Sequence, residues 1–460
     1  MFDFYYASEE WGTLVHICRR WRNLAFTSPR HLNLQLCCEP PWRSVKKMLD
    51  IWPELPIYLH AHDHPYGPYQ GAIGDVVAAL KLNHRVSGIF FENTLDSAWE
   101  TFVPLMQHPF PALTLLWIRP YGPIRNEISH SFLGGSAPCL QDLELAQFPF
   151  PALPELLLSA TKLIRLRYHD IPPSGYISPQ AMVTALSALT RLESLSLTFR
   201  SPQSLPDRAI RISPPHMRTL LPALTYLCYQ GVPEYMEDLV AQIDAPLLES
   251  VVISLFHQEV LEVSQLAKFI RRADKLSQLD RAQVAFSDNC ISVTLSQELL
   301  AQVGSVDPKT LEVDLACSER DLRISYLAQF CASCLPTLSP FECLDIYAPY
   351  NPTWAWGGII DPDPSPQWLE LLRLFDAVKV IRVHKFVAAR VARALRGLPA
   401  ERATEVLPAL ENVLISELQL SDPGKEIISE FSDPRQLCGH PVDIYYQIGK
   451  GLVIKVLRGK

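Results

Sequence analysis

The chain has 460 residues, of which 48% are hydrophobic and 20% are charged, a balance typical of folded proteins and unlike that of disordered ones. Its formal net charge of −8 argues against a nucleic-acid-binding protein, whose surface would be basic. The sequence has no apolar run long enough to span a bilayer and no secretory signal at its start, so we expect a cytoplasmic or nuclear protein without a membrane partner.

The first predicted element is an amphipathic helix over residues 11–26, WGTLVHICRRWRNLAF. Its apolar residues recur at three- and four-residue steps, and three arginines lie at its polar margin. Thr27-Ser28-Pro29 should end the helix, because the residue before a proline avoids the α conformation. A short strand is expected over residues 31–36.

Three histidines follow in the segment HAHDH, at His60, His62 and His64. A strand would place all three imidazoles on one face, where they could hold zinc or nickel. Because no further ligand is near in the sequence, a solvated polar edge is the simpler interpretation. We therefore expect no metal site and no cofactor.

A repeated hexapeptide pattern, apolar at positions i, i+3 and i+5, occupies most of the remaining chain. Its copies are VSGIFF from Val86, LTLLWI from Leu113, LQDLEL from Leu140, LIRLRY from Leu163, LESLSL from Leu192, LTYLCY from Leu224, LESVVI from Leu248, LDRAQV from Leu279, TLEVDL from Thr310, FECLDI from Phe341, VKVIRV from Val378 and LENVLI from Leu410. The copies recur at intervals of roughly 23 to 37 residues, which bracket leucine-rich repeats and their longer variants. Helical stretches and proline-rich joints lie between them.

This spacing predicts one strand in each repeat. Positions i+3 and i+5 lie on one face of a strand and i+2, i+4 and i+6 on the other, so each strand buries one row and exposes the other. We expect parallel neighbouring strands with an inward row that is nearly fully buried: Leu143, Leu145, Leu166, Leu195, Leu197, Leu227 and Ile253. The predicted fold is α/β, a leucine-rich-repeat solenoid with a curved parallel sheet and outer helices.

The outward row is the candidate binding surface. It includes residue types enriched at binding hot spots, namely Trp117, Arg119, Arg165, Arg167, His169, Tyr226, Tyr347, Arg382 and His384. It also holds Asp142, Glu144, Ser194, Ser196 and Thr198. The patch from Trp117 to His169 is basic within an acidic chain, which would suit an acidic or phosphorylated peptide. A solvated sheet face without any hot spot remains the alternative.

No catalytic motif is found, and we expect no enzyme activity and no catalytic residues. Cys331 and Cys334 form a C-x-x-C pair, but no second pair follows at zinc-ribbon spacing. They are predicted to be buried helix residues.

The segment HICRRWRNLAF resembles the last helix of the F-box, where a V-C-R-x-W-R-x-L-type run recurs. Later stretches, among them MLDIWPELPI, FLGGSAPCLQDLEL and YMEDLVAQIDAPLLESV, are similar to the large fungal class of F-box proteins with leucine-rich repeats. The resemblance implies a partial F-box-like segment over residues 1–30 and a repeat solenoid over 31–460, clearest at 86–260. It also implies contacts to an Skp-type adaptor from Leu14, Ile17, Cys18, Trp21 and Leu24.

The function implied by this resemblance is that of a substrate-recognition subunit of a cullin-type ubiquitin ligase. The opening Leu-Pro segment of an F-box is absent ahead of the helix of residues 11–26, where the sequence reads MFDFYY, so we expect adaptor binding at least about tenfold weaker than that of a complete F-box. The partners would be the adaptor, the cullin complex and an unknown protein substrate. The alternatives are a leucine-rich-repeat scaffold without a ligase role and a truncated, non-functional relative.

Overall fold

The structure of the chain is a computed structural model. It describes residues 18–27, 34–37, 45, 48–49, 55–62, 70–94, 96–122, 124, 127–202, 217–256, 263–287, 290–297, 310–316, 323–334, 341–348, 365–399, 402, 404–416, 442–448 and 452–455. The chain divides into two compact units. Unit 1 comprises residues 1–211 and 219–224, and unit 2 comprises residues 212–218 and 225–460. Both units are mixed α/β, with parallel strands and helices.

The sheet of unit 1 is built from parallel strands that pair in chain order. These are β1 (Leu34–Cys37), β2 (Ile57–His62), β3 (Val86–Thr94), β4 (Leu115–Pro120), β5 (Asp142–Ala146), β6 (Arg165–Ile171) and β7 (Ser194–Phe199), each hydrogen-bonded to the next. A two-residue strand, β8 (Thr219–Leu220), also belongs to unit 1 but is not part of this sheet. From β2 to β7, the connections between neighbouring strands contain helices, because parallel pairing requires a crossover.

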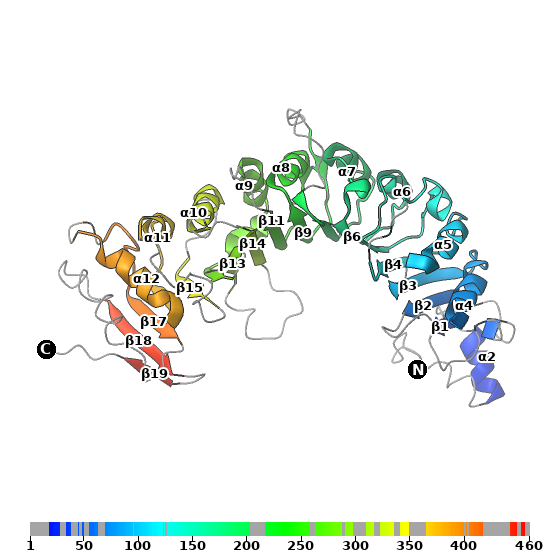
Figure 1. Ribbon diagram of the computed structural model, residues 1–460, viewed down its shortest axis with the longest axis horizontal. Coiled ribbons are helices and arrows are strands. Elements are labelled where there is room, and N and C mark those ends of the chain that lie inside the picture. The colour runs from blue at the N-terminus through cyan, green and yellow to red at the C-terminus, as the bar shows by residue number, and fades with distance from the viewer. Residues whose placement is uncertain are drawn as a thin grey trace. The chain divides into compact units, whose positions relative to one another are not determined.

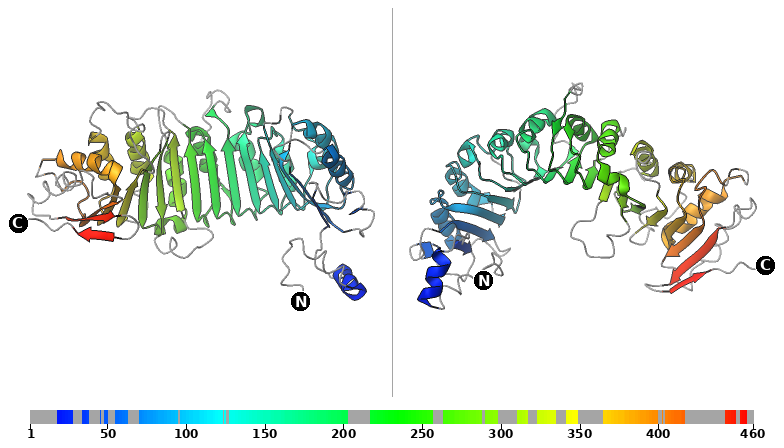
Figure 2. Two further views of the ribbon diagram at one scale, coloured as in Figure 1. Left: turned by 60° about the horizontal axis from the view of Figure 1, so that its bottom comes forward. Right: turned by 180° about the vertical axis from the view of Figure 1, so that it is seen from behind.

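The helices of unit 1 lie along one face of this sheet (Figure 1). They are α4 (Gln70–Leu80), α5 (Asp96–Leu105), α6 (Leu153–Ser159) and α7 (Pro179–Leu186), with the short helices η2 (Phe132–Gly135) and η3 (Pro173–Gly175) between them. Helix α2 (Arg19–Thr27) precedes the sheet. Figure 2 shows the other face without a helix on it, and we call this the open face of unit 1.

The repeats of unit 1 share one local geometry, which explains why the strands fall in register. Before each of β4 to β7, a tight turn closes with a backbone bond from a buried leucine, for example Leu113 N to Phe110 O and Leu163 N to Ala160 O. The backbone N–H that follows binds the preceding repeat, as Ile164 N does to Gln141 O at 2.8 Å. The leucine at position i of the hexapeptide therefore closes the turn, and the residue after it joins each strand to its neighbour.

The core of unit 1 lies between the sheet and its helices. Leu143, Leu145, Leu166, Leu195 and Leu197 are buried, as predicted for the inward row. Behind them lies a cluster of aromatic rings in edge and tilted contacts, formed by Phe91, Trp99, Phe102, Phe132, Phe148 and Phe150. The predicted inward row is confirmed in this unit, whereas the outward positions of β5 and β7 are mostly buried as well.

Tyr168 faces the same interior and is held by polar contacts. Its hydroxyl donates to the carbonyl of Phe148 at 2.7 Å and accepts the N–H of Phe150 at 3.2 Å. The hydroxyl also lies 2.5 Å from the position that a Cβ would take at Gly175. The absence of a side chain at residue 175 is thus required for this packing.

Unit 2 has the strands β9 (Tyr226–Gly231), β10 (Ile243–Asp244), β11 (Ser250–Leu255), β12 (Arg281–Phe286), β13 (Cys290–Ser296), β14 (Thr310–Ala316), β15 (Cys343–Tyr347), β16 (Val380–His384), β17 (Asn412–Ser416), β18 (Asp443–Ile448) and β19 (Leu452–Lys455). Its helices are α8 (Pro233–Gln242), α9 (Ser264–Arg271), η5 (Asp274–Gln278), α10 (Arg323–Cys334), α11 (Ser365–Leu372) and α12 (Lys385–Arg396). Leu227 and Ile253 are buried, as predicted. Every predicted hexapeptide of the chain thus contains a strand.

The strand order of unit 2 departs from the prediction that all these strands are parallel neighbours in chain order. Strand β14, not β12, pairs with β11, and β12 pairs in parallel with β15. Between them β13 runs antiparallel to both β12 and β14. Only three residues separate β12 from β13, too few for the crossover that a parallel pair needs, so the chain makes a hairpin instead.

A carboxylate connects successive helices of unit 2. Glu237 in α8 accepts the backbone N–H groups of Gln265 and Leu266 at the start of α9, both at 2.8 Å. The first N–H groups of a helix have no partner inside it, and a negative charge is favourable there. Glu237 therefore caps α9 and fixes it against α8.

No helix among the described residues is long and apolar enough to cross a membrane.

Candidate functional site

The open face of unit 1 carries a continuous row of polar and aromatic side chains. Register places Phe90, Trp117, Glu144, Arg167 and Ser196 opposite one another on β3 to β7. Arg119, Asp142, Arg165 and His169 occupy the flanking positions on the same face. Because side chains alternate along a strand, the leucines between these residues point into the core and leave this row outside.

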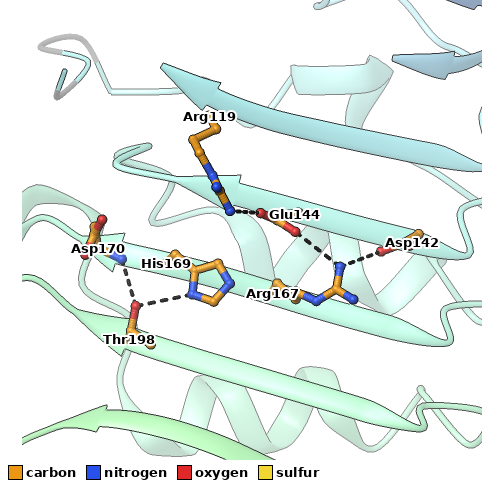
Figure 3. Close-up of polar contacts among 7 residues, drawn as sticks. All are labelled: Arg119, Asp142, Glu144, Arg167, His169, Asp170 and Thr198. Atoms are coloured by element: carbon orange, nitrogen blue, oxygen red, sulfur yellow. Dashed lines mark hydrogen bonds and ion pairs between the residues drawn. The ribbon is translucent and has the colours of Figure 1, made fainter. Parts of the chain in front are cut away.

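Glu144 is the centre of an ion-pair ladder across three strands (Figure 3). Its Oε1 lies 2.7 Å from Nη2 of Arg119 on β4, and its Oε2 lies 3.1 Å from Nη1 of Arg167 on β6. The carboxylate thus accepts a charge-assisted hydrogen bond from each neighbouring strand.

Asp142 extends the ladder on the same strand. Its Oδ2 accepts from Nε and Nη2 of Arg165 at 2.7 and 2.6 Å, and its Oδ1 lies 3.6 Å from Nη1 of Arg167. We use the name ion-pair ladder for these five residues: Arg119, Asp142, Glu144, Arg165 and Arg167. The patch predicted to be basic is therefore a set of paired charges.

The members of the ladder differ in depth. The side chains of Glu144 and Asp142 are only 4% and 14% exposed. Those of Arg119, Arg165 and Arg167 are 44%, 48% and 32% exposed. A partner that approaches this face would meet guanidinium N–H donors, with the carboxylates beneath them.

An aromatic strip lies beside the ladder, formed by Tyr58, His60, Phe90 and Trp117, each of them half-buried. The His60 and Phe90 rings stack with centroids 4.6 Å apart, and Phe90 meets Trp117 edge-on at 4.3 Å. The Tyr58 ring lies over Gly88, where a Cβ would come within 2.4 Å of it. Burial and the nearby Asp142 raise the pKa of Tyr58.

The strip joins the ladder at Trp117. Cζ of Arg119 lies 5.5 Å from the centroid of the Trp117 ring, within the range of a cation–π contact. Nε1 of Trp117 is buried and has no hydrogen-bond partner in the described structure. The apolar and charged parts of the face therefore form one continuous surface.

His169 lies at the other end of the row, on β6. Its Nδ1 is 3.4 Å from Oγ1 of Thr198, which also accepts the N–H of Asp170 at 2.9 Å (Figure 3). Burial lowers the pKa of His169 below 6.5; Arg119 and Arg167 lower it as well, while Glu144 and Asp170 act in the opposite direction. The neutral imidazole is thus favoured.

Three residues expected on the outward row of unit 1 are less accessible than predicted. Glu144, Ser196 and Thr198 are buried. The Ser196 hydroxyl has no hydrogen-bond partner in the described structure. Only Ser194, which is half-buried, remains open on β7.

Of the predicted binding residues, Trp117, Arg119, Arg165, Arg167 and His169 come together in unit 1, whereas Tyr226, Tyr347, Arg382 and His384 lie in unit 2. In unit 2, Tyr347 is exposed and Nη1 of Arg382 lies 3.8 Å from Asp345. The expectation that His384 is available to a partner is wrong.

His384 is not available to a partner because it is only 2% exposed. Its ring packs against Tyr347, with centroids 5.2 Å apart, and against Phe386, at 4.9 Å. Helix α12 begins at the next residue, so the chain turns away from the sheet at His384, position i+6 of this repeat.

The adaptor-binding prediction falls partly outside the described residues. Leu14 and Ile17 lie outside them, as does the side chain of Leu24, while Cys18 is exposed and Trp21 is half-buried. The helix predicted over residues 11–26 corresponds to α2, described from Arg19 to Thr27.

Of the residues considered for metal binding, His64 and the side chain of His62 also lie outside the described part of the chain. Among the residues that the structure does describe, no group of three side chains that could hold a metal ion is found. Cys331 and Cys334 are buried in α10, as predicted. Burial raises the pKa of both thiols, which makes them unreactive.

Two features of the sequence point to this arrangement. Positions i+2, i+4 and i+6 of VSGIFF give Gly88, Phe90 and Glu92, which would have placed Phe90 next to Trp117. Glu144 and Arg167 share position i+4 of their repeats, so a common register implies their pairing.

Comparison with known proteins adds little. No family model and no curated protein matches the sequence. Among solved structures, the chain is similar to the leucine-rich repeat-containing protein LegL7 from Legionella pneumophila, at 12% identity and a TM-score of 0.27, over 87% of this chain and 97% of that one. This TM-score is too low for the likeness to bear on the fold or function of the chain.

Proposed function

We propose that the chain is a leucine-rich-repeat solenoid that serves as a protein-binding scaffold, with the open face of unit 1 as its binding surface. The observation that carries this proposal is the continuous row of Phe90, Trp117, Arg119 and Arg167 across adjacent strands. Tryptophan and arginine are the residue types most enriched at binding hot spots. The sheet and the buried carboxylates hold these side chains in place, which reduces the entropy lost on binding.

We further propose that the bound protein is a substrate for ubiquitin transfer, and that the chain is a substrate-recognition subunit of a cullin-type ligase. The support is the resemblance of HICRRWRNLAF to the last helix of an F-box, together with the helix α2 over part of that segment. In this role the N-terminal helix would dock on an Skp-type adaptor, and the scaffold would hold the substrate near the ubiquitin-charged enzyme.

A scaffold without a ligase role is the second candidate. It is favoured by the fact that Trp21, the central apolar residue of the described helix, is already half-buried within the chain. In this case α2 would serve as a cap on the first repeat, because a bare terminal repeat exposes apolar surface.

Photo-crosslinking tests the binding surface. A benzophenone amino acid would replace Leu115, a half-buried residue on the open face of β4, and in a matched variant Leu158, an exposed residue of α6. We expect a defined protein adduct from position 115 that is absent from position 158. Equal adducts from both positions would contradict a specific role for the open face.

Titration with a purified Skp-type adaptor tests the ligase role. We expect measurable binding by the wild-type chain and its loss on Ile17→Asp, which places a charge on the apolar side of the predicted helix. A chain that binds no adaptor but retains its open-face adduct would be a scaffold without a ligase role.

A further inference from the structure

We propose that the open face of unit 1 binds an extended peptide segment in which a carboxylate side chain lies close to an aromatic or aliphatic one. The carboxylate would be held by the arginines of the ion-pair ladder and the apolar side chain by the aromatic strip. This inference rests on the proposed function and names the chemistry of the partner.

The ladder presents unused hydrogen-bond donors toward solvent. A guanidinium has five N–H donors in a planar fork that matches a carboxylate. Arg119 makes one hydrogen bond, through Nη2 to Glu144, and one cation–π contact, to Trp117. Its other N–H groups belong to a side chain that is 44% exposed, so they can meet an incoming acceptor without breaking the existing pair.

Buried carboxylates fix the direction of these donors. Glu144 and Asp142 hold all three guanidiniums from below, so the arginine side chains lose little further freedom when a ligand binds. An arginine that had to be ordered on binding would lose side-chain entropy. The ladder is therefore preorganised to bind an acceptor group.

The charge count favours a carboxylate over a phosphate. Three guanidiniums face two carboxylates, an excess of one positive charge. Glu92 on β3 lies opposite Arg119 in register and cancels this excess, and Asp170, a further carboxylate, is exposed at the end of β6. A phosphate group carries about two negative charges at neutral pH. The surface thus offers directional donors to one negative charge and too little positive charge for two.

The aromatic strip specifies the second half of the ligand. Phe90 and Trp117 pack edge-on against each other, and the Tyr58 ring lies over Gly88. The strip is therefore a rigid apolar surface with half-buried rings. Such rings provide contact area with little loss of conformational freedom. An aliphatic or aromatic side chain of the partner would pack on this surface beside Arg119.

Geometry limits the spacing between the two groups of the ligand. Trp117 on β4 and Arg167 on β6 are two strands apart, a distance of about 10 Å at the usual strand spacing. An extended peptide covers about 3.3 Å per residue. The carboxylate should therefore lie within about three residues of the apolar side chain.

Peptide selection with the full-length chain tests the proposal. A random peptide library displayed on phage would be selected against the wild-type chain and, in parallel, against Arg119→Ala, Trp117→Ala and Arg402→Ala. Arg402 is a matched control, because it pairs with Glu405 at 2.9 Å but belongs to unit 2 and is no part of the face. Glu144 keeps Arg167 as a partner when Arg119 is replaced, so Arg119→Ala should fold, which circular dichroism would verify.

We expect enriched peptides with an aspartate or glutamate within about three residues of an apolar residue, as the strand spacing implies. A synthetic peptide of the enriched sequence should bind about tenfold or more weakly to Arg119→Ala, since a hydrogen bond to a charged group is lost. Its affinity for Arg402→Ala should be unchanged. Arg119→Lys, which keeps the charge but not the planar fork, should restore binding only in part.

The contrary outcomes are distinct. Enriched peptides that require Trp117 but carry no acidic residue would overturn this inference and leave the proposed binding face in place. A phosphoserine peptide that binds at least about tenfold more tightly than its aspartate counterpart would overturn the choice of a carboxylate. Failure to enrich any peptide would overturn the inference as well, and the crosslinking at Leu115 would then decide the proposed function independently.

Discussion

Nη2 of Arg119 lies 2.7 Å from Oε1 of Glu144, and this contact joins two strands whose residues lie 25 positions apart in the chain. The other oxygen of the same carboxylate binds Arg167 on the next strand. A single buried acid therefore organises the exposed charges of three repeats. The following predictions test that organisation and the fold beneath it.

Glu144→Gln should destabilise unit 1. The substitution keeps the shape of the side chain but removes the charge that two arginines share, and hydrogen bonds to charged groups contribute about 1.5–3 kcal/mol each at most. Because the arginines are partly exposed and can be rehydrated, we expect a loss of about 1–3 kcal/mol in urea unfolding. Glu405→Gln, which removes the charge from an exposed surface pair, is the control and should leave stability unchanged.

Tyr168→Phe should cost about 1–3 kcal/mol in the free energy of unfolding. The hydroxyl is buried and bonds the Phe148 carbonyl and the Phe150 N–H, and both would lose that partner. Gly175→Ala should be at least as harmful in the wild-type chain, because the new Cβ would lie 2.5 Å from the hydroxyl.

In the Tyr168→Phe background the same Gly175→Ala change should cost less, because the clashing atom is gone. The coupling between the two sites is measured by unfolding the single variants and the double variant. Strictly additive losses would contradict the contact between Tyr168 and Gly175.

The strand register predicts unequal losses along β7. Leu195→Ala should cost about 2–5 kcal/mol, as removal of a buried leucine side chain does. Ser194→Ala should change the free energy of unfolding by at most about 0.5 kcal/mol, because Ser194 is half-buried on the open face. Ser196→Ala should also cost little, but for another reason: its hydroxyl is buried and has no partner in the described structure. Equal losses at positions 194 and 195 would show that the register is wrong.

His169 should make unit 1 less stable in mild acid. Burial lowers the pKa of this histidine below the value of 6.5 that it has when unfolded, so the unfolded chain binds the proton more readily. The contribution is fully present above pH 6.5 and is lost as the pH falls through the folded pKa. The difference in stability between wild type and His169→Gln should therefore change between neutral pH and about pH 5, in the direction that favours the variant in acid. A difference independent of pH would show that His169 is not perturbed by its surroundings.

The sequence pattern predicted the strands well because each strand carries its own alternation of buried and open residues. The turn between β12 and β13 was missed, although alternating runs on both sides of Ser287-Asp288-Asn289 are a hairpin signal. Strand order in unit 2 follows from that hairpin, since it places β13 antiparallel and β14 beside β11. Local periodicity does not contain that information.

The sequence predicted which charged residues lie on the candidate site, but it did not predict the net charge of that site. The arginines and acids of β4 to β6 were assigned to one face correctly, but their net charge depends on which pairs form, and this depends on register across strands. The burial of His384 was not predictable from β16 alone, because two aromatic rings, one on β15 and the other at the start of α12, cover it. Of the aromatic strip, only Trp117 was predicted on the binding surface, because Tyr58 and His60 lie on β2, outside the repeated hexapeptides.

The most direct test of the central claim is the affinity of the open face for the protein that crosslinks at position 115. Isothermal titration would compare the wild-type chain with Trp117→Ala and with Leu158→Ala, a truncation on the helical side of unit 1. Since Trp117 lies at the junction of the aromatic strip and the ion-pair ladder, its loss should raise the dissociation constant at least about thirtyfold, as hot-spot residues do. Leu158→Ala should leave the dissociation constant unchanged. Equal affinities of wild type and Trp117→Ala would contradict the assignment of this face as the binding surface.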